Sequence, residues 1–204
     1  MHFCASMQSQ FREKSQKKIL IIDAHPDPES LSSSIARASW EALGKKGELL
    51  ELRNLNFELS LKNGYRRPTE LEDDLKKAQS LISEADHLVI ATPVWWGSVP
   101  ALLKGFFDRT LVPGFGFKYR KGSPLWDKLL AGRSAQLYVT MDSPYWWFRF
   151  VYGNPAINML KKTVLEFCGI KPVKVRVFDQ VRSSTSERRK RWLNSVRKDS
   201  LRLI

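Results

Sequence analysis

Short apolar runs alternate with amphipathic segments along this chain, and this alternation limits the folds available to it. The strand-like runs cover residues 18–24, 48–55, 87–92, 134–140 and 172–179. The segments with helical spacing of apolar residues cover 31–42, 71–85, 100–110, 155–168 and 186–203. Such alternation predicts a parallel sheet with helices on both faces. For five strands, the simplest doubly wound arrangement has the order 2-1-3-4-5.

The length of 204 residues predicts one compact domain with a full core. We expect this domain at residues 18–204, preceded by a variable extension at residues 1–17. The extension has no apolar segment of the kind found in signal peptides. Glycine and proline are frequent between residues 111 and 128, which predicts a long structured loop and a candidate flap.

The formal net charge of +13 is concentrated at the two ends of the chain. Residues 1–18 carry +3 and residues 181–204 carry +6, which leaves +4 for the rest. A basic terminal helix is more often a solvated face than a binding stripe, and no nucleic-acid-binding motif accompanies it. We therefore do not expect a nucleic-acid partner, whereas peripheral association with acidic lipid headgroups stays open.

Cysteine and histidine are rare in this sequence. The two cysteines, Cys4 and Cys168, do not indicate a disulfide framework, so a reducing cytoplasm is expected. No apolar run reaches the roughly 20 residues of a bilayer-spanning helix. No cluster of His and Cys has metal-ligand spacing, so we expect no metal site, and we expect His87 to be structural.

In doubly wound sheets, ligands bind beyond the carboxyl ends of the strands, near the switch point. This rule selects three loops, at residues 25–32, 93–99 and 141–154. In the first, a strand feeds a helix through a polar turn, which favours an anion site because unpaired N–H groups and the helix dipole point to one place. The turn lacks the glycine motifs of nucleotide sites. The alternative is that His25 only caps the strand end.

The other two loops are rich in aromatic residues. Trp95 and Trp96 are adjacent at a strand end, and strand neighbours point to opposite sides, so at least one should be exposed or should line a pocket. The alternative is that both pack against the following helix. Six aromatic residues lie between positions 145 and 152. They indicate a wall for flat organic molecules, a subunit interface, or both.

Three blocks of sequence resemble one known family. They read H-P-D-P-E-S-L-S at 25–32, T-P-V-W-W-G-S-V-P-A-L-L-K-G-F-F-D-R at 92–109, and F-C-G at 167–169. Over residues 18–180 the chain resembles the flavodoxin-like NAD(P)H:quinone oxidoreductases. These include the DT-diaphorase type, the drug-activity-modulator type and the ancillary subunits of potassium efflux systems. The resemblance implies a flavodoxin-like α/β fold, bound FMN or FAD, and NAD(P)H as hydride donor.

The resemblance also implies roles for residues of the three loops. The residues implied to hold the flavin phosphate are His25, Ser30, Leu31 and Ser32. Those implied to flank the isoalloxazine ring are Pro93, Val94, Trp95, Trp96 and Gly97. Those implied to approach its pyrimidine end are Thr140, Met141, Asp142 and Ser143. Tyr145 and Tyr152 are the nearest candidates for the residues that assist proton balance in the DT-diaphorase type.

One run departs from the family pattern. Members often have Thr-Thr-Gly-Gly where this chain has Thr140-Met141-Asp142-Ser143, followed by Pro144. Proline offers no N–H group, and Asp142 would repel an anionic reduced flavin if it pointed inward. The departure leaves the specificity for quinones open.

These observations lead to an expected function. We expect a cytoplasmic homodimer that transfers a hydride from NAD(P)H through a flavin to quinones or similar flat acceptors, by a ping-pong mechanism. The alternative is a regulatory flavoprotein subunit of a potassium efflux system.

Overall fold

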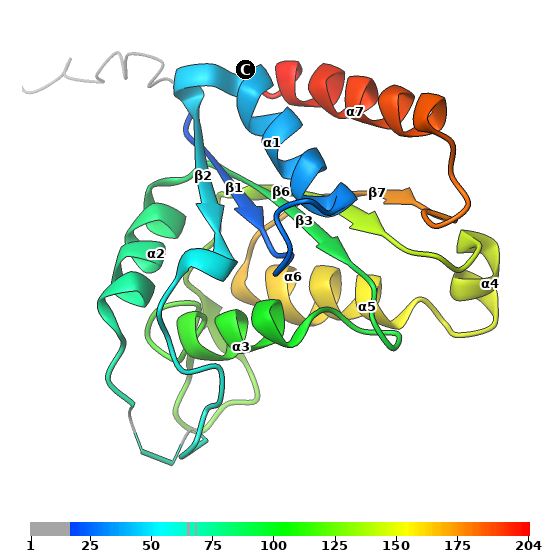
Figure 1. Ribbon diagram of the computed structural model, residues 1–204. Helices are drawn as coiled ribbons and strands as arrows, with labels where there is room; N and C mark the ends of the chain where they lie inside the picture. The colour runs from blue at the N-terminus through cyan, green and yellow to red at the C-terminus, as the bar shows by residue number, and fades with distance from the viewer. Residues whose placement is uncertain (1–16, 65, 68) are drawn as a thin grey trace, which may run out of the picture.

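The computed structural model describes residues 17–64, 66–67 and 69–204 (Figure 1). The predicted extension at 1–17 lies, apart from Lys17, outside these residues. The main sheet consists of β1 (Ile19–Asp23), β2 (Gly47–Glu51), β3 (His87–Pro93), β6 (Ser134–Thr140) and β7 (Val173–Phe178). Its order is β2-β1-β3-β6-β7, and every neighbouring pair is parallel. The predicted flavodoxin-like order 2-1-3-4-5 is confirmed.

Helices cover both faces of this sheet, as Figure 1 shows. One face packs against α1 (Leu31–Leu43) and α7 (Ser186–Leu201). The other face packs against α2 (Asp73–Glu84), α3 (Ala101–Thr110) and the consecutive segments α5 (Pro155–Asn158), η3 (Met159–Leu165) and α6 (Glu166–Cys168). Side chains alternate between the faces, so strands covered on both sides are apolar throughout. All five residues of β1 are buried, and Asp23 is the charged one among them.

The helix ends follow local sequence signals. Ser30 caps α1, because its Oγ accepts the Ser33 N–H at 3.1 Å. Thr185 caps α7 in the same way. Glycines with positive φ end two of the helices, Gly44 after α1 and Gly169 after α6.

Several segments differ from their predicted form. The second strand ends at Glu51 instead of continuing to residue 55, because the chain turns through η2 (Leu52–Asn54) and brings Arg53 inward to Asp23. A short 3₁₀ segment, η1 (Gly44–Lys46), precedes that strand. The predicted helix at 155–168 contains a π-helical segment, η3.

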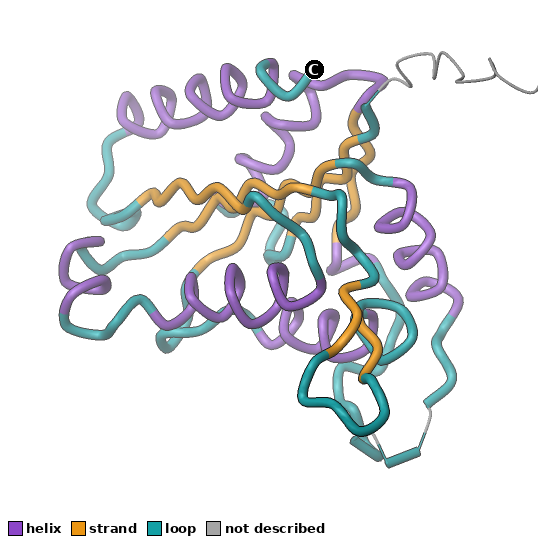
Figure 2. Tube along the Cα trace, turned by 180° about the vertical axis from the view of Figure 1, so that it is seen from behind, coloured by secondary structure: helices purple, strands orange, loops and turns teal. Residues whose placement is uncertain are grey.

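Two stretches that the sequence predicts as loops contain regular structure. Residues 111–128 contain a small antiparallel hairpin of β4 (Phe117–Tyr119) and β5 (Trp126–Lys128) (Figure 2). The hairpin packs through Trp126, whose ring stacks on Phe167 at 4.3 Å between centroids. Residues 141–154 contain α4 (Tyr145–Phe150). The periodicity of such short elements is too brief to read from sequence.

Candidate functional site

The carboxyl ends of β1, β3 and β6 lie side by side, because these strands are parallel and in register. Asp23 lies opposite Ala91, and Pro93 lies opposite Thr140. The three loops predicted to bind a ligand therefore meet at one edge of the sheet. Two adjoining hollows open there, and Val94, Met141 and Asp142 line both.

We call the smaller hollow, of about 220 Å³, the turn hollow. Its lining residues are His25, Ser30, Leu31, Ser32, Pro93, Val94, Trp95, Thr140, Met141, Asp142 and Val181. We call the larger, of about 480 Å³, the aromatic hollow. Its lining residues are Val94, Trp96, Gly97, Met141, Asp142, Ser143, Phe148, Tyr152 and Pro155. Every residue predicted to bind the cofactor lines one hollow or the other.

Hydrogen-bond donors surround the turn hollow. Leu31 and Ser32 are the first two residues of α1, and their backbone N–H groups have no hydrogen-bond partner in the described part of the chain. Nδ1 of His25 lies 2.9 Å from the Asp27 nitrogen and 3.1 Å from the Asp27 carbonyl oxygen, so its role as acceptor or donor depends on the tautomer. Burial lowers the pKa of His25, which favours the neutral ring. In the tautomer whose Nδ1 accepts the Asp27 N–H, Nε2 carries the proton and can donate to a ligand.

A buried ion pair lies beneath this turn. The fully buried Asp23 accepts the His25 N–H at 3.1 Å and the Ser33 hydroxyl at 3.0 Å, both at Oδ1. Its Oδ2 accepts Nη1 of Arg53 at 2.6 Å. Arg53 also pairs with Glu51. Sequence reasoning missed these residues, although a charge that ends an apolar run signals a buried partner of opposite charge.

Direct bonds join the first loop to the strand ends that form the rest of the turn hollow. The buried hydroxyls of Ser32 and Thr140 lie 2.8 Å apart. Val94 N–H donates to the Thr140 carbonyl at 2.8 Å. Asp142 is exposed, and its Oδ1 accepts the Arg182 N–H at 2.9 Å. The Asp142 carboxylate, which lines both hollows, is thus oriented by the backbone that follows β7.

The loop after β3 is a tight turn that presents its tryptophans outward. Trp95 and Ser98 exchange two backbone hydrogen bonds of 2.9 Å. Trp96 and Gly97 have φ angles of 51° and 75°, as the two central residues of a type I′ turn require. Trp96 is fully exposed and Trp95 is half exposed, which confirms that at least one is not in the core. The Trp95 N–H is used inside the turn, so Trp96 and Gly97 carry the N–H groups that can meet a ligand.

The aromatic stretch 145–152 is divided between the core and the surface. Phe148 is buried and anchors α4, whereas the large side chains left exposed are Trp146, Trp147, Phe150 and Tyr152. Tyr152 lines the aromatic hollow. Tyr145 packs against the core and lines neither hollow. The structure therefore places one of the two predicted catalytic tyrosines at the site.

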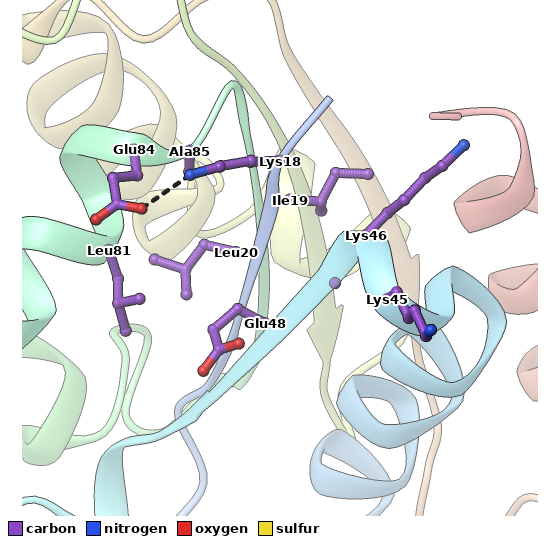
Figure 3. A pocket seen from close by; sticks show the side chains of 10 residues that line it. Lys18, Ile19, Leu20, Lys45, Lys46, Glu48, Leu81, Glu84 and Ala85 are labelled. Atoms are coloured by element: carbon purple, nitrogen blue, oxygen red, sulfur yellow. Dashed lines mark hydrogen bonds and ion pairs between the residues drawn. The ribbon is translucent and has the colours of Figure 1, made fainter. Parts of the chain in front are cut away.

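Another hollow, of about 220 Å³, lies at the opposite edge of the sheet, at the amino ends of β1 and β2 (Figure 3). Lys18, Lys45, Lys46 and Glu84 are among its lining residues. The Lys18 ammonium pairs with Glu84 at 3.0 Å, and both side chains are more than half exposed. No residue of this hollow belongs to the three predicted loops, so it lies apart from the candidate site.

The described part of the chain offers neither a metal-ligand cluster nor a membrane-spanning helix. Across residues 17–204, with positions 65 and 68 left aside, no three His, Cys, Asp or Glu side chains are arranged to hold a metal ion. In the same part of the chain, no helix has both the length and the apolar character needed to cross a bilayer.

Known proteins resemble this chain over nearly its whole length. A mouse (Mus musculus) ribosyldihydronicotinamide dehydrogenase [quinone] is 29% identical over an alignment of 211 positions, gaps included, that covers 88% of each chain. The solved NAD(P)H:quinone oxidoreductase from Methanothermobacter marburgensis is 22% identical, with a TM-score of 0.76 over 93% of this chain and 100% of that one. An FMN-dependent NADH-azoreductase from Bacillus anthracis, solved with FMN, is 20% identical, with a TM-score of 0.65 over 92% and 99%.

At such identities the two solved structures support the fold alone. The decisive match is to the family described as "Flavodoxin-like fold", whose model spans residues 17–198. The order of the strands and this match indicate the same fold. The chain belongs to the family with the flavodoxin-like fold.

Proposed function

We propose that this chain binds a flavin and uses NAD(P)H to reduce quinones or similar flat acceptors. The observation that carries the proposal is the junction of the two hollows, one with free N–H donors and one with aromatic walls. A flavin needs this combination, because it joins a phosphate to a flat ring system. The name of the mouse relative supports the same chemistry.

The residues fit the two parts of such a cofactor. The N–H groups of Leu31 and Ser32 and Nε2 of His25 would hold the phosphate, at the positive end of the α1 dipole. Val94, Trp95 and Gly97 would border the ring. The cofactor itself supplies the hydride chemistry. Because FMN and FAD share this phosphate and ring, the donors fit either.

The protein would supply position and a dry environment. Trp96, Phe148 and Tyr152 wall the aromatic hollow, and such walls favour flat molecules and exclude water. One hollow of about 480 Å³ suits the nicotinamide and the acceptor in turn, as a ping-pong mechanism requires. Tyr152 is the candidate among these residues for handling a proton, since its side chain is at the wall.

The test begins with flavin uptake. The purified chain, mixed with FMN or FAD and passed through a desalting column, should retain the flavin, and mass spectrometry of the released cofactor identifies it. The loaded protein should oxidise NADH or NADPH when menadione, a flat quinone, is present. A chain that retains neither flavin would refute the proposal.

A matched pair of variants tests the phosphate site. Proline is tolerated at the first helical position after an extended residue, and it removes one N–H group. Leu31→Pro follows the extended Ser30, and Ser186→Pro follows the extended Thr185 at the start of α7. We expect Leu31→Pro to weaken FMN binding by about tenfold or more, the value of one hydrogen bond to a charged group. Ser186→Pro should leave it unchanged, and equal effects would contradict the assignment.

The expected homodimer, membrane association and cytoplasmic location stay predictions. The exposed aromatic side chains of α4 are the surface on which a second copy would pack. The basic residues of α7 are the surface on which acidic lipids would act. The regulatory role in potassium efflux also stays a prediction.

A further inference from the structure

We propose that Arg53 is a positioning residue of the phosphate site, which neutralises the buried Asp23 carboxylate so that the 25–32 turn can accept an anion. The inference rests on the proposed flavin site. It concerns a residue outside the three loops, one that lines neither the turn hollow nor the aromatic hollow.

Negative charge in and next to the 25–32 turn opposes the binding of an anion there. The ionisable side chains between residues 23 and 32 are Asp23, His25, Asp27 and Glu29, and His25 favours its neutral form. Asp27 and Glu29 are exposed, so water screens them. Asp23 is fully buried, and a buried carboxylate repels a nearby anion much more strongly because the surroundings have a low dielectric constant. A phosphate above this turn therefore requires a counter-charge for Asp23.

Arg53 has the position to supply that counter-charge. Its side chain is 12% exposed, and its Nη1 lies 2.6 Å from Oδ2 of Asp23. Its second contact, with Glu51, fixes the other side of the guanidinium. The cluster of Asp23, Glu51 and Arg53 carries one net negative charge with the arginine and two without it. Removing Arg53 would leave an unpaired buried carboxylate beneath the anion site.

Arg53 also holds the turn at two places. Nη1 lies 3.4 Å from the His25 carbonyl and 3.4 Å from the Ser33 hydroxyl. These two residues bracket the donors of the turn hollow, since one starts the turn and the other lies in the first turn of α1. The shape of the donor set and its electrostatic potential thus depend on the same side chain.

The experiment compares FMN with riboflavin, which has the same ring and no phosphate. Dissociation constants of both are measured by flavin fluorescence for the wild type and for Arg53→Met. We expect the wild type to prefer FMN, and we expect Arg53→Met to reduce that preference by about tenfold or more. Arg53→Lys keeps the positive charge and should keep most of the preference.

A double variant separates charge from general damage. Asn in place of Asp23 keeps an oxygen for the His25 N–H, so Asp23→Asn with Arg53→Met removes both charges and retains that contact. We expect the double variant to recover most of the preference for FMN. If Arg53→Met alone does not fold, the double variant and Arg53→Lys still carry the test, and a double variant without that preference would overturn the proposal.

The matched control is Arg109, which is also buried and also paired. Its Nη2 lies 2.7 Å from Glu72, and its side chain is 1% exposed. It lines neither hollow of the candidate site. Arg109→Met should lower stability and leave the FMN preference unchanged, and an equal loss in both single variants would overturn the proposal.

The outcomes distinguish a failure of the proposed function from a failure of the role of Arg53. A wild type that binds none of FMN, FAD and riboflavin would refute the proposed function. A wild type that prefers FMN, together with an Arg53→Met variant that keeps the same preference, would refute the role of Arg53 and leave the proposed function standing.

Discussion

Trp96 combines a strained backbone with a side chain that gains nothing from folding. Its φ of 51° lies in the left-handed region, which costs a residue with a Cβ atom about 1–2 kcal/mol. Its side chain is fully exposed, so burial does not repay this cost. Asparagine tolerates the same conformation. We therefore expect Trp96→Asn to stabilise the flavin-free protein.

The size of the gain follows from the backbone alone. Asparagine retains part of the strain, so we expect about 0.5–1 kcal/mol, which raises the melting temperature by roughly 1–4 °C in a chain of this size. Urea unfolding followed by far-ultraviolet circular dichroism measures the change, because that signal does not depend on the tryptophan that is removed. The control is Trp146→Asn, which replaces an exposed tryptophan on α4 where φ is not positive. That variant should show no gain.

The same substitution should damage the proposed activity. Trp96 lines the aromatic hollow, so its loss should raise the KM for a flat quinone severalfold while the affinity for flavin phosphate stays the same. Strain retained at a residue that contacts ligand is a common feature of functional sites. If Trp96→Asn raises the free energy of unfolding no more than its control does, the reasoning is wrong.

Two further predictions concern buried polar groups. Ser32→Ala leaves the Thr140 hydroxyl without its partner, so the free energy of unfolding measured in urea should fall by about 1–3 kcal/mol. Adding Thr140→Val to this variant should lower it little further. Strictly additive losses would contradict this prediction. The second prediction concerns His87, because burial lowers its pKa to about 4. Between pH 6.5 and 4 the unfolded state therefore binds a proton at this residue and the folded state does not. This contribution to stability is complete above pH 6.5 and should fall by about 3 kcal/mol as pH drops to 4, and His87→Gln should flatten the profile; parallel profiles would contradict the assignment.

The strand order could be predicted because the decisive signals are local. The apolar runs and the helical spacing of the segments between them depend on neighbours within one strand or turn. The β4–β5 hairpin could not be predicted, because it owes its place to the stacking of Trp126 on Phe167, a contact between positions 41 residues apart. The early end of β2 has the same kind of cause, in the contact between Arg53 and Asp23.

The candidate site also contains residues that local signals predict and residues that only long-range contacts bring together. The loops could be selected from the rule for doubly wound sheets, and the cofactor residues within them do gather around two joined hollows. The supporting residues could not be selected, since Asp23 and Arg53 are 30 positions apart and neither has a motif. The two tyrosines also could not be ranked, because their different burial depends on how α4 packs.

The sequence by itself determined the class of fold, the edge of the sheet where the candidate site lies and the aromatic and polar halves of that site. These follow from short-range periodicity and from the direction in which parallel strands end. Tertiary structure alone decided which groups remain available there: the free N–H groups of Leu31 and Ser32, the His25 ring held against Asp27, and the arginine beneath them. Availability depends on which partners long-range packing has already supplied, and that information is not local to any stretch of the chain.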